Sequence, residues 1–297
     1  MKTLTVFTPT FNRAYCLGQC YQSLINQTSQ DFCWLIIDDG SSDNTKDLVN
    51  QWIKENNIEI HYHYQENQGM HGGHNSAYKL VETPLNVCID SDDFMPNDAV
   101  ENILNAWKLI KDEPKFAGIV GLDADKQNNI IGTKIPESLT ETTLYDLYNF
   151  HGVKGDKKLV YKTDVVKKYP AYPIYEGERF VPLGYLYQLI DQDYKLLPQN
   201  KVYCIVEYMQ DGSSMNMLKQ YRRHPNGFAF TRKSSMVLGK TFVDRFKNAI
   251  HYVSCSMFTR NASFLKESPK KLLTILAIPF GVVLNLYIRF KTKNDFR

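Results

Sequence analysis

Hydrophobic and polar positions alternate in two ways over the first 110 residues. Short apolar or β-branched runs predict buried strands, which we place at residues 4–8, 33–38, 58–64 and 86–89. Apolar residues at helical spacing predict helices at 14–26, 45–55, 73–81 and 98–110, and Asp43 is placed to cap the second of these. Strands that alternate with helices predict an α/β fold, with a Rossmann-like, mainly parallel sheet flanked by helices.

Beyond residue 115 the pattern is looser. It predicts strands at 117–122, 159–161 and 202–208, a polar loop or hairpin at 123–129, and helices at 163–168 and 180–191. Residues 218–265 look mostly helical and basic. Because no Pro/Gly/Ser-rich linker separates the two halves, we expect them to share one body.

The segment Leu272–Ile288 is apolar and flanked by Lys270, Lys271 and Arg289. It is shorter than the about 20 residues of a spanning helix, and Pro279 and Gly281 interrupt it. The basic flanks favour a segment that lies on an anionic membrane surface. A buried helix of a globular protein or oligomer, and a true membrane span, are the alternatives.

Composition narrows the classes of function. The chain has 297 residues and a net charge of only +3, which argues against nucleic acid as its main partner. Its six cysteines form no C-x-x-C pair, so we interpret them as reduced thiols of a cytoplasmic protein, with disulfides as the alternative. The N-terminal residues look like a first strand rather than a signal peptide.

Polar clusters follow three of the predicted strands. Thr8-Pro9-Thr10-Phe11-Asn12-Arg13 leaves the first, at a turn whose backbone groups can hydrogen-bond a flat base, and Asp38-Asp39-Gly40 leaves the second. Asn67-Gln68-Gly69-Met70-His71-Gly72-Gly73-His74 leaves the third and opens a helix whose N–H groups are accessible to phosphate. Each cluster also has a structural interpretation as a turn or helix cap. A zinc pair at the two histidines lacks the usual spacing.

A fourth cluster carries the strongest signal. A buried strand leads into Asp90-Ser91-Asp92-Asp93. Three carboxylates in four residues repel one another unless a cation is bound, and hard oxygen ligands select Mg²⁺ or Mn²⁺, usually together with a diphosphate. Asp93 has an alternative interpretation as a purely structural acid.

The four clusters, in this order, resemble glycosyltransferase family 2, the inverting enzymes with the GT-A fold. The matching pieces are TPTFNR, IIDDGSSDNT, NQGMHGGHN and IDSDD, within residues 3–110. The resemblance implies that Thr8, Pro9, Thr10, Asn12 and Asp39 hold the base, usually uracil. It also implies donor contacts from Gly69, Asp90 and Ser91, and a metal held by Asp92 and Asp90. Many members carry an arginine or lysine in the third cluster, and His74 is our choice for its replacement.

The resemblance further implies a catalytic carboxylate at a helix start in the acceptor half. The nearest match is Glu176-Gly177-Glu178-Arg179, although Arg179 stands where the family usually has a second acid. We assign the general base to Glu178, with Glu176 second and Asp191 third. A histidine near the C-terminus completes the metal site in the family, and His224 is the candidate here.

These inferences predict an inverting, metal-dependent glycosyltransferase that uses Mn²⁺ or Mg²⁺. It would move a sugar from a nucleotide-sugar donor, expected to be a UDP-sugar, to a glycan or lipid-linked acceptor in bacterial surface polysaccharide synthesis. We divide the chain into a nucleotide-sugar-binding part (1–115), an acceptor-binding part (116–217) and a helical C-terminal region (218–297). The expected location is the cytoplasm, at the inner face of the cell membrane. A nucleotidyltransferase and a non-catalytic nucleotide- or sugar-binding descendant are the alternatives.

Overall fold

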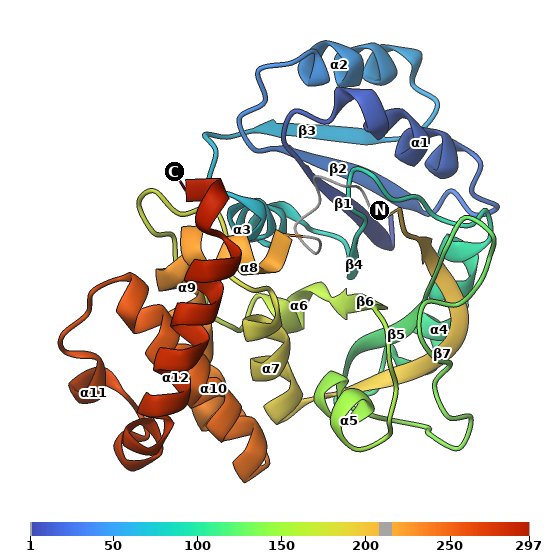
Figure 1. Cartoon of the computed structure of the whole chain (residues 1–297). Coiled ribbons are helices and arrows are strands. Elements are labelled where there is room, and N and C mark those ends of the chain that lie inside the picture. Colours follow the sequence, from blue (N-terminus) through green and yellow to red (C-terminus); the bar gives the residue numbers. More distant parts are fainter. Residues whose placement is uncertain (1, 208–215, 297) are drawn as a thin grey trace. The chain divides into compact units, whose positions relative to one another are not determined.

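The computed structural model describes residues 2–207 and 216–296 (Figure 1). Contacts between residues group the chain into two compact units. Unit 1 comprises Met1–Pro170 and Ile190–Glu207, and unit 2 comprises Ala171–Leu189 and Tyr208–Arg297. The functional division at residues 115 and 217 concerns binding rather than packing, and it stays a prediction.

Unit 1 is built on seven strands, as the resemblance and the alternating pattern imply. They are β1 (Leu4–Thr10), β2 (Phe32–Asp38), β3 (Ile60–Tyr64), β4 (Leu85–Cys88), β5 (Phe116–Ala124), β6 (Lys157–Lys162) and β7 (Lys195–Ile205). The helices between them are α1 (Ala14–Ile25), α2 (Thr45–Glu55), α3 (Met70–Leu80), α4 (Ala99–Ile110), α5 (Leu144–Asn149) and α6 (Thr163–Val166). Helix α7 (Gly184–Asp193) follows them along the chain.

The strands form one mixed sheet in the order β3-β2-β1-β4-β6-β5-β7. The pairs β1–β2, β1–β4, β2–β3 and β5–β7 are parallel, whereas β6 is antiparallel to both of its neighbours. The sheet is therefore mostly parallel and flanked by helices, and the predicted α/β fold class is confirmed.

Alternate residues of the strands face two apolar layers. Leu4, Val6, Trp34 and Ile36 pack with buried residues of α1, α2 and α4 in the larger core cluster. Phe7, Leu35 and Ile37 point the other way and pack with Ala77 of α3. Figure 1 shows α1 and α2 on one side of β1–β3 and α3 on the other. This covering on both faces explains why the parallel strands are almost continuously apolar.

Two local features differ from the pattern-based expectation. Strand β7 was expected at 202–208 but occupies Lys195–Ile205, and Tyr208 lies outside the described residues. Its Pro198 is tolerated because β7 is an edge strand with register shifts against β5. Helix α5 was not expected. It is short, and its first N–H groups are capped by Thr143 and by the carboxylate of Asp191.

Unit 2 contains a helical region, as expected for the C-terminal part. Its helices are α8 (Met217–Arg223), α9 (Pro225–Leu238), α10 (Phe242–Phe258), α11 (Phe264–Glu267) and α12 (Lys271–Lys291), followed by a 3₁₀ turn at Lys293–Phe296. Helix α12 is continuous through Pro279 and Gly281. It packs closely on α10, because a Cβ at Gly281 would come within 2.5 Å of the Val253 side chain.

Candidate active site

The order of the strands defines one edge of the sheet where ligands are expected. From β1 the chain steps outward through β2 to β3 and then returns to place β4 on the other side of β1. This reversal creates a topological switch point at the carboxyl ends of β1 and β4, where ligands of open α/β sheets bind. The acidic cluster follows β4 directly, and Thr10 ends β1.

The threonines of the first cluster have different environments. Thr8 is fully buried, and its hydroxyl oxygen accepts a 2.9 Å hydrogen bond from the indole N–H of Trp34. Thr10 is also buried, but its hydroxyl has no hydrogen-bond partner among the described residues. Pro9 lies against α3, because a Cβ at Gly73 would sit 3.0 Å from the proline Cβ. Thr8 therefore serves the core, while Thr10 keeps an unused polar group at the strand end.

Asn12 joins the first cluster to the second. Its backbone is left-handed, with a φ of 54°, a conformation that asparagine tolerates better than most residues. Its amide oxygen accepts hydrogen bonds from the backbone N–H groups of Ser42 and Asp43, and its own N–H donates to the Ser41 hydroxyl. The Asp43 carboxylate in turn caps Thr45 at the start of α2, as predicted. Asn12 thus holds two loops together.

The acidic pair after β2 is buried and hydrogen-bonded. Asp38 accepts from the Tyr62 hydroxyl at 2.6 Å and from the Ser41 N–H at 2.8 Å. Asp39 accepts from the N–H groups of Gln68 and Gly69, at 2.9 and 2.7 Å. Gly69 has a φ of 81° and precedes α3 directly, so Asp39 fixes the position at which that helix begins.

His74 lies in the first turns of α3 and is buried. Its Nδ1 is 3.2 Å from the Tyr78 hydroxyl and its Nε2 is 3.6 Å from the Cys88 sulfur, and the edge of its ring meets Phe7. Burial lowers the pKa of His74 to about 4, although the negative charge of Asp90 acts in the opposite direction. The side chain is therefore neutral near pH 7, and it cannot replace the positive charge of an arginine or lysine.

The acidic cluster divides into buried and partly exposed members. Asp93 is buried and accepts hydrogen bonds from the Glu207 N–H at 3.0 Å and the Cys204 thiol at 3.5 Å. Burial and the neighbouring negative charge of Asp90 raise the pKa of Asp93 to about 7. Ser91 is buried, whereas Asp90 and Asp92 are half-buried. The carboxylates of Asp90 and Asp92 are thus the members positioned for a ligand.

Two charged residues that interact with this cluster were not predicted from the sequence. Asp123 is buried at the end of β5, and its Oδ1 has no hydrogen-bond partner within the described parts of the chain. Burial raises the pKa of Asp123 to about 6, against the opposing effect of Lys158 on β6. Burial by itself lowers the pKa of the Lys158 amine, yet the negative groups around it raise that pKa well above its usual range. The sequence did contain one indication that Lys158 is buried. It is two residues before the core residue Val160 on β6, so the two side chains share a face of the strand.

Glu178, in unit 2, is buried, and its carboxylate contacts the first residues of α9. One carboxylate oxygen accepts from the backbone N–H and side-chain amide of Asn226, at 2.9 and 2.8 Å, and the other accepts from the Gly227 N–H at 2.9 Å. Glu178 therefore holds the N-terminus of α9. Glu176 is exposed, and the carboxylate of Asp191, in unit 1, caps α5.

His224 lies between α8 and α9 in the same unit. Its Nδ1 accepts a 3.0 Å hydrogen bond from the Arg179 N–H, so the proton of the neutral ring is on Nε2. Burial, with help from Arg223 and Arg179, lowers the pKa of His224 to about 4. Metal ligation through Nε2 would require the ring to move its proton and release the Arg179 N–H.

The side chains at the carboxyl edge fit a hard divalent cation. Asp90 and Asp92 supply carboxylate oxygens, which Mg²⁺ and Mn²⁺ prefer, and both are partly accessible. The inward Asp93 supports their loop from behind by bonding to Glu207. These side chains lie at the switch point of the sheet, where ligands of open α/β sheets bind.

Comparison with known proteins agrees with this geometry. The model of glycosyl transferase family 2 matches residues 5–141. The teichoic acid poly(glycerol phosphate) polymerase of Staphylococcus epidermidis is 33% identical over 101 residues, which are 34% of this chain and 14% of the polymerase. The chain therefore spans only a small part of that relative.

Solved structures match nearly the whole chain in fold. S. aureus TarS 1–349 in complex with UDP-GlcNAc aligns with a TM-score of 0.59 and 18% identity, over 95% of this chain and 81% of the TarS 1–349 chain. The mannosyltransferase PcManGT from Pyrobaculum calidifontis, in complex with GDP-Man and Mn²⁺, aligns with a TM-score of 0.56 and 13% identity, over 96% and 87% of the two chains. Residues 5–141 therefore form a domain of glycosyl transferase family 2, within a chain whose fold is similar to that of GT-A glycosyltransferases such as TarS.

Proposed function

We propose that this protein is an inverting, metal-dependent glycosyltransferase. It takes a sugar from a nucleotide-sugar donor, a UDP-sugar, and transfers it to a hydroxyl of a glycan or lipid-linked acceptor in bacterial surface polysaccharide synthesis. The observation that carries the proposal is the division of the acidic cluster: Asp90 and Asp92 are partly exposed at the switch point, while Asp93 turns inward. The UDP-GlcNAc bound by TarS and the polymer made by the staphylococcal relative support the choice of donor and pathway.

The donor site is formed by the loops at the carboxyl edge. We assign contacts with the base and ribose to Pro9, Thr10 and Asp90, because the Thr10 hydroxyl is unpartnered among the described residues. Gly69, Ser91 and neutral His74 complete the donor-binding set, the last as a hydrogen-bonding group rather than a cation. Thr8, Asn12 and Asp39 act by holding these loops in place.

Asp92 and Asp90 would hold Mn²⁺ or Mg²⁺, with His224 as the third predicted ligand. A divalent cation there supplies Lewis-acid stabilisation of the negative charge that develops on the departing diphosphate. Asp93 contributes by fixing the loop that carries both ligands.

Glu178 is the proposed general base. It would accept the proton of the acceptor hydroxyl while that oxygen bonds to the anomeric carbon and the bond from this carbon to the diphosphate breaks. Its three hydrogen bonds at the start of α9 orient the carboxylate, and the oxygen that accepts from Gly227 has capacity for one further hydrogen bond. Glu176 is the exposed alternative two residues earlier.

The base assignment is tested with two matched variants. Glu178→Gln should retain donor binding and lose turnover, whereas Glu176→Gln should retain both. Circular dichroism and thermal unfolding would show whether α9 is intact, and Glu178→Asp provides a second variant if Gln disrupts the fold. Full turnover by a folded Glu178→Gln protein would move the base to another residue.

The transferase reaction is tested by titrating the protein with UDP, GDP and CTP, with and without Mn²⁺, and by measuring diphosphate release from a panel of nucleotide sugars. We expect metal-dependent UDP binding and release of UDP from at least one donor. Pyrophosphate release from a nucleoside triphosphate would favour a nucleotidyltransferase. Binding without release from any donor would favour a non-catalytic descendant.

Helix α12 supports contact with the cell membrane. It is the helix in the described residues that is long and apolar enough to cross a bilayer, yet one of its faces packs on α10 through Gly281 and Asn285. The Asn285 amide donates to the Ser254 carbonyl at 2.9 Å. The opposite face, the apolar α12 face, is exposed and consists of Leu272, Ile275, Leu276, Phe280, Val283, Leu286, Tyr287 and Phe290.

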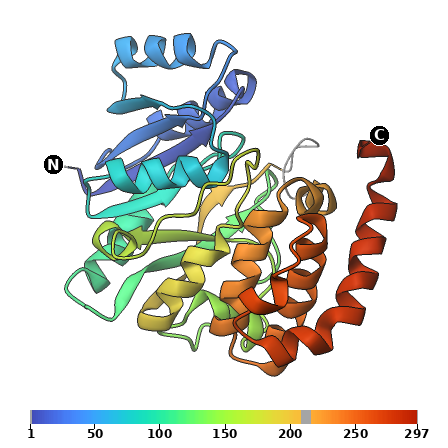
Figure 2. The same ribbon diagram turned by 90° about the vertical axis from the view of Figure 1, so that its left-hand side faces the viewer.

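This arrangement favours a helix that lies on the bilayer over one that spans it, because spanning would detach the polar packed face from α10. Lysines and arginines at both ends of α12 complement anionic headgroups. Figure 2 shows α12 in red along one side of the helical region. The proposed location is therefore the cytoplasmic face of the cell membrane.

Vesicle binding distinguishes this proposal from self-association. The full chain should sediment with phosphatidylglycerol vesicles and much less with phosphatidylcholine vesicles, and salt should weaken the binding. Leu276→Glu with Phe280→Glu should abolish it, whereas Leu109→Glu, at an exposed position of α4, should not. Sedimentation as a dimer that Leu276→Glu disrupts, without vesicle binding, would assign the face to an oligomer interface instead.

A further inference from the structure

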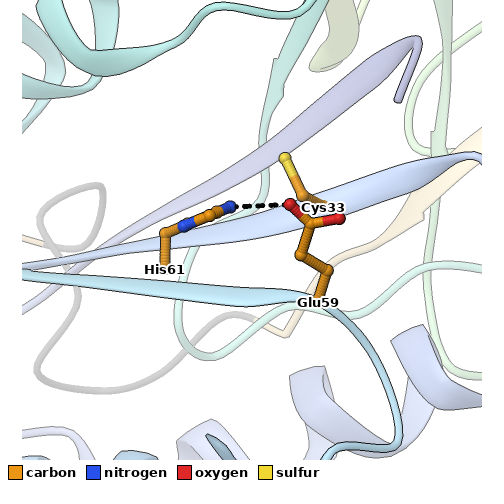
Figure 3. Close-up of side chains that lie close together, drawn as sticks. All are labelled: Cys33, Glu59 and His61. Carbon is orange, nitrogen blue, oxygen red and sulfur yellow. Dashed lines mark hydrogen bonds and ion pairs between the residues drawn. The ribbon is translucent and has the colours of Figure 1, made fainter. Parts of the chain in front are cut away.

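A second cluster of metal-ligating side chains lies in unit 1, apart from the acidic cluster. Cys33 is on β2, Glu59 directly precedes β3, and His61 is on β3 (Figure 3). One ligand atom from each lies within 4.8 Å of the others. The His61 Nε2 is 2.9 Å from a Glu59 carboxylate oxygen, and Figure 3 shows the Cys33 sulfur beside the same carboxylate.

The strand register brings these residues together. Trp34 pairs with Ile60 and Leu35 with His61, so Cys33 is beside Glu59 on the neighbouring strand. Side chains at alternate positions share a face, which places Glu59 and His61 on the same side of the edge strand as Cys33. Cys33 is the second residue of β2, whereas Asp38, at the donor edge, is the last. The cluster is therefore at the amino end of the strands, away from the proposed donor site.

A chain of hydroxyl groups supports the cysteine. The Thr83 hydroxyl donates to the Leu85 carbonyl at 2.8 Å, so the 2.7 Å bond between Thr5 and Thr83 is donated by Thr5. The Thr5 oxygen, 3.4 Å from the Cys33 sulfur, then accepts from the thiol. When a metal displaces the thiol proton, the Thr5 hydroxyl can turn and donate to the thiolate. Hydrogen bonds of this kind orient and tune metal ligands.

A cavity of about 560 Å³ adjoins the three side chains. Its lining includes Cys33, Glu59 and His61, together with Lys2, His63 and Glu82. Cys33 is buried, while Glu59 and His61 are exposed. The space leaves room for a fourth ligand, such as water or a small anion, on the open side of the cluster.

We propose that Cys33, Glu59 and His61 form a Zn²⁺ site with an open fourth position. Sulfur, imidazole and carboxylate donors suit zinc, whereas an all-oxygen set such as Asp90 and Asp92 suits Mg²⁺ or Mn²⁺. Binding breaks the Cys33 S–H bond, forms the Zn–S bond and releases one proton to water. The site ties edge strand β3 to β2. It goes beyond the proposed transferase reaction and does not depend on it.

Cobalt is the test probe, because Co²⁺ occupies such sites and a bound thiolate gives it an intense charge-transfer absorption. The full chain, freed of metal by chelator dialysis under reducing conditions, is titrated with Co²⁺ and then with Zn²⁺. We expect a thiolate absorption that saturates at one Co²⁺ per chain and is displaced by Zn²⁺. The absence of this absorption would overturn the proposal.

Variants locate the signal. Cys33→Ser should remove the absorption, and His61→Ala should weaken cobalt binding at least about tenfold. His61 is exposed, so its replacement tests the site even if Cys33→Ser destabilises the fold. Cys88→Ser is the matched control, because Cys88 is also close to a histidine, His74, at the donor edge. An absorption that survives in Cys33→Ser but disappears in Cys88→Ser would place the metal at the donor edge and reject the proposed site.

The two metal sites also separate in their effects. Cys33→Ser and His61→Ala should leave Mn²⁺-dependent UDP release within about twofold of the parent, and Zn²⁺ should raise the thermal midpoint of Asp92→Asn as it does that of the parent. If the parent protein gives the cobalt signal but shows no transferase activity, the result contradicts the transferase proposal and leaves the zinc proposal standing.

Discussion

The loops after β1 and β2 use their polar residues differently from the loop after β4. Asn12, Asp38 and Asp39 accept hydrogen bonds from neighbouring backbone and side-chain groups, so they hold the loops to one another. After β4, Asp93 is buried and accepts hydrogen bonds from Glu207 and Cys204, whereas Asp90 and Asp92 stay half-buried. Residues of one sequence motif therefore divide between scaffold and proposed ligand binding, and the degree of burial distinguishes the two groups.

The largest effect is expected in the acidic cluster, where replacing Asp92 tests metal binding and replacing Asp93 tests support of the loop. Asp92→Asn should lower kcat/KM for transfer by about a thousandfold, about 4 kcal/mol of transition-state stabilisation, because a predicted metal ligand is lost. Asp93→Asn should stay within about tenfold of the parent, since the pKa of Asp93, about 7, already allows a neutral form. Steady-state kinetics measure the loss of kcat/KM in each variant. Equal losses would contradict the division between Asp92 as a metal ligand and Asp93 as a support of the loop.

The buried histidine beside this cluster should make the fold sensitive to acid. The folded-state pKa of His74 is about 4, below the ordinary 6.5, so the unfolded chain binds the extra proton first. Stability is therefore fully present above pH 6.5 and is lost as pH falls towards 4, by about 3 kcal/mol from His74. Urea unfolding at pH 7 and pH 4.5 measures this loss. His74→Gln should reduce the slope without removing it, because His224 and His251 have similarly lowered pKa values.

The scaffold role of Asp39 predicts a stability effect rather than a purely catalytic one. Asp39→Asn should lower the free energy of unfolding by about 2 kcal/mol, because an amide replaces part of a carboxylate that accepts from two backbone N–H groups. Glu66→Gln, an exposed change in the same loop, is the control and should be neutral. If Asp39→Asn leaves the free energy of unfolding unchanged, Asp39 belongs with the residues that contact the donor rather than with those that hold the loops together.

The two threonines of β1 give the smallest and sharpest contrast. Thr8→Val should cost about 1 kcal/mol, because the Trp34 indole N–H loses its buried acceptor. Thr10→Val should leave stability unchanged and raise the KM for the donor a few-fold, because its hydroxyl has no partner among the described residues. Denaturant unfolding and donor kinetics of the pair decide between these outcomes.

The sequence predicted unit 1 well because its elements repeat a simple physical pattern. Apolar strands with helices of matching spacing reproduce β1 to α4 within a few residues, and the acidic cluster falls at the expected strand end. Pattern reasoning failed where long-range partners decide the structure. Pro198 is tolerated in β7 by the edge position, and α5 depends on a cap from Asp191, far along the chain.

The roles of individual residues were less predictable than the elements. Thr8 and Thr10 lie two residues apart on β1 and look alike in sequence. The Trp34 indole N–H nevertheless donates a hydrogen bond to the Thr8 hydroxyl, whereas the Thr10 hydroxyl has no partner among the described residues. Lys158 was missed because a lysine in a strand usually points to solvent, whereas here buried acids surround it. The pairing of Cys33 with His61 depends on the register of β2 against β3, which periodicity cannot supply.

The bonds that Asn12 and Asp39 make between loops have a thermodynamic consequence for ligand entry. Loops that are already joined lose little conformational entropy when a donor binds, since few backbone dihedrals remain to be ordered. Association should then be limited by diffusion and desolvation rather than by loop closure, and the heat-capacity change of UDP binding should be small for its buried surface. Replacing Asn12 would release these loops from one another, so nucleotide binding would have to order them and would carry an added loss of conformational entropy.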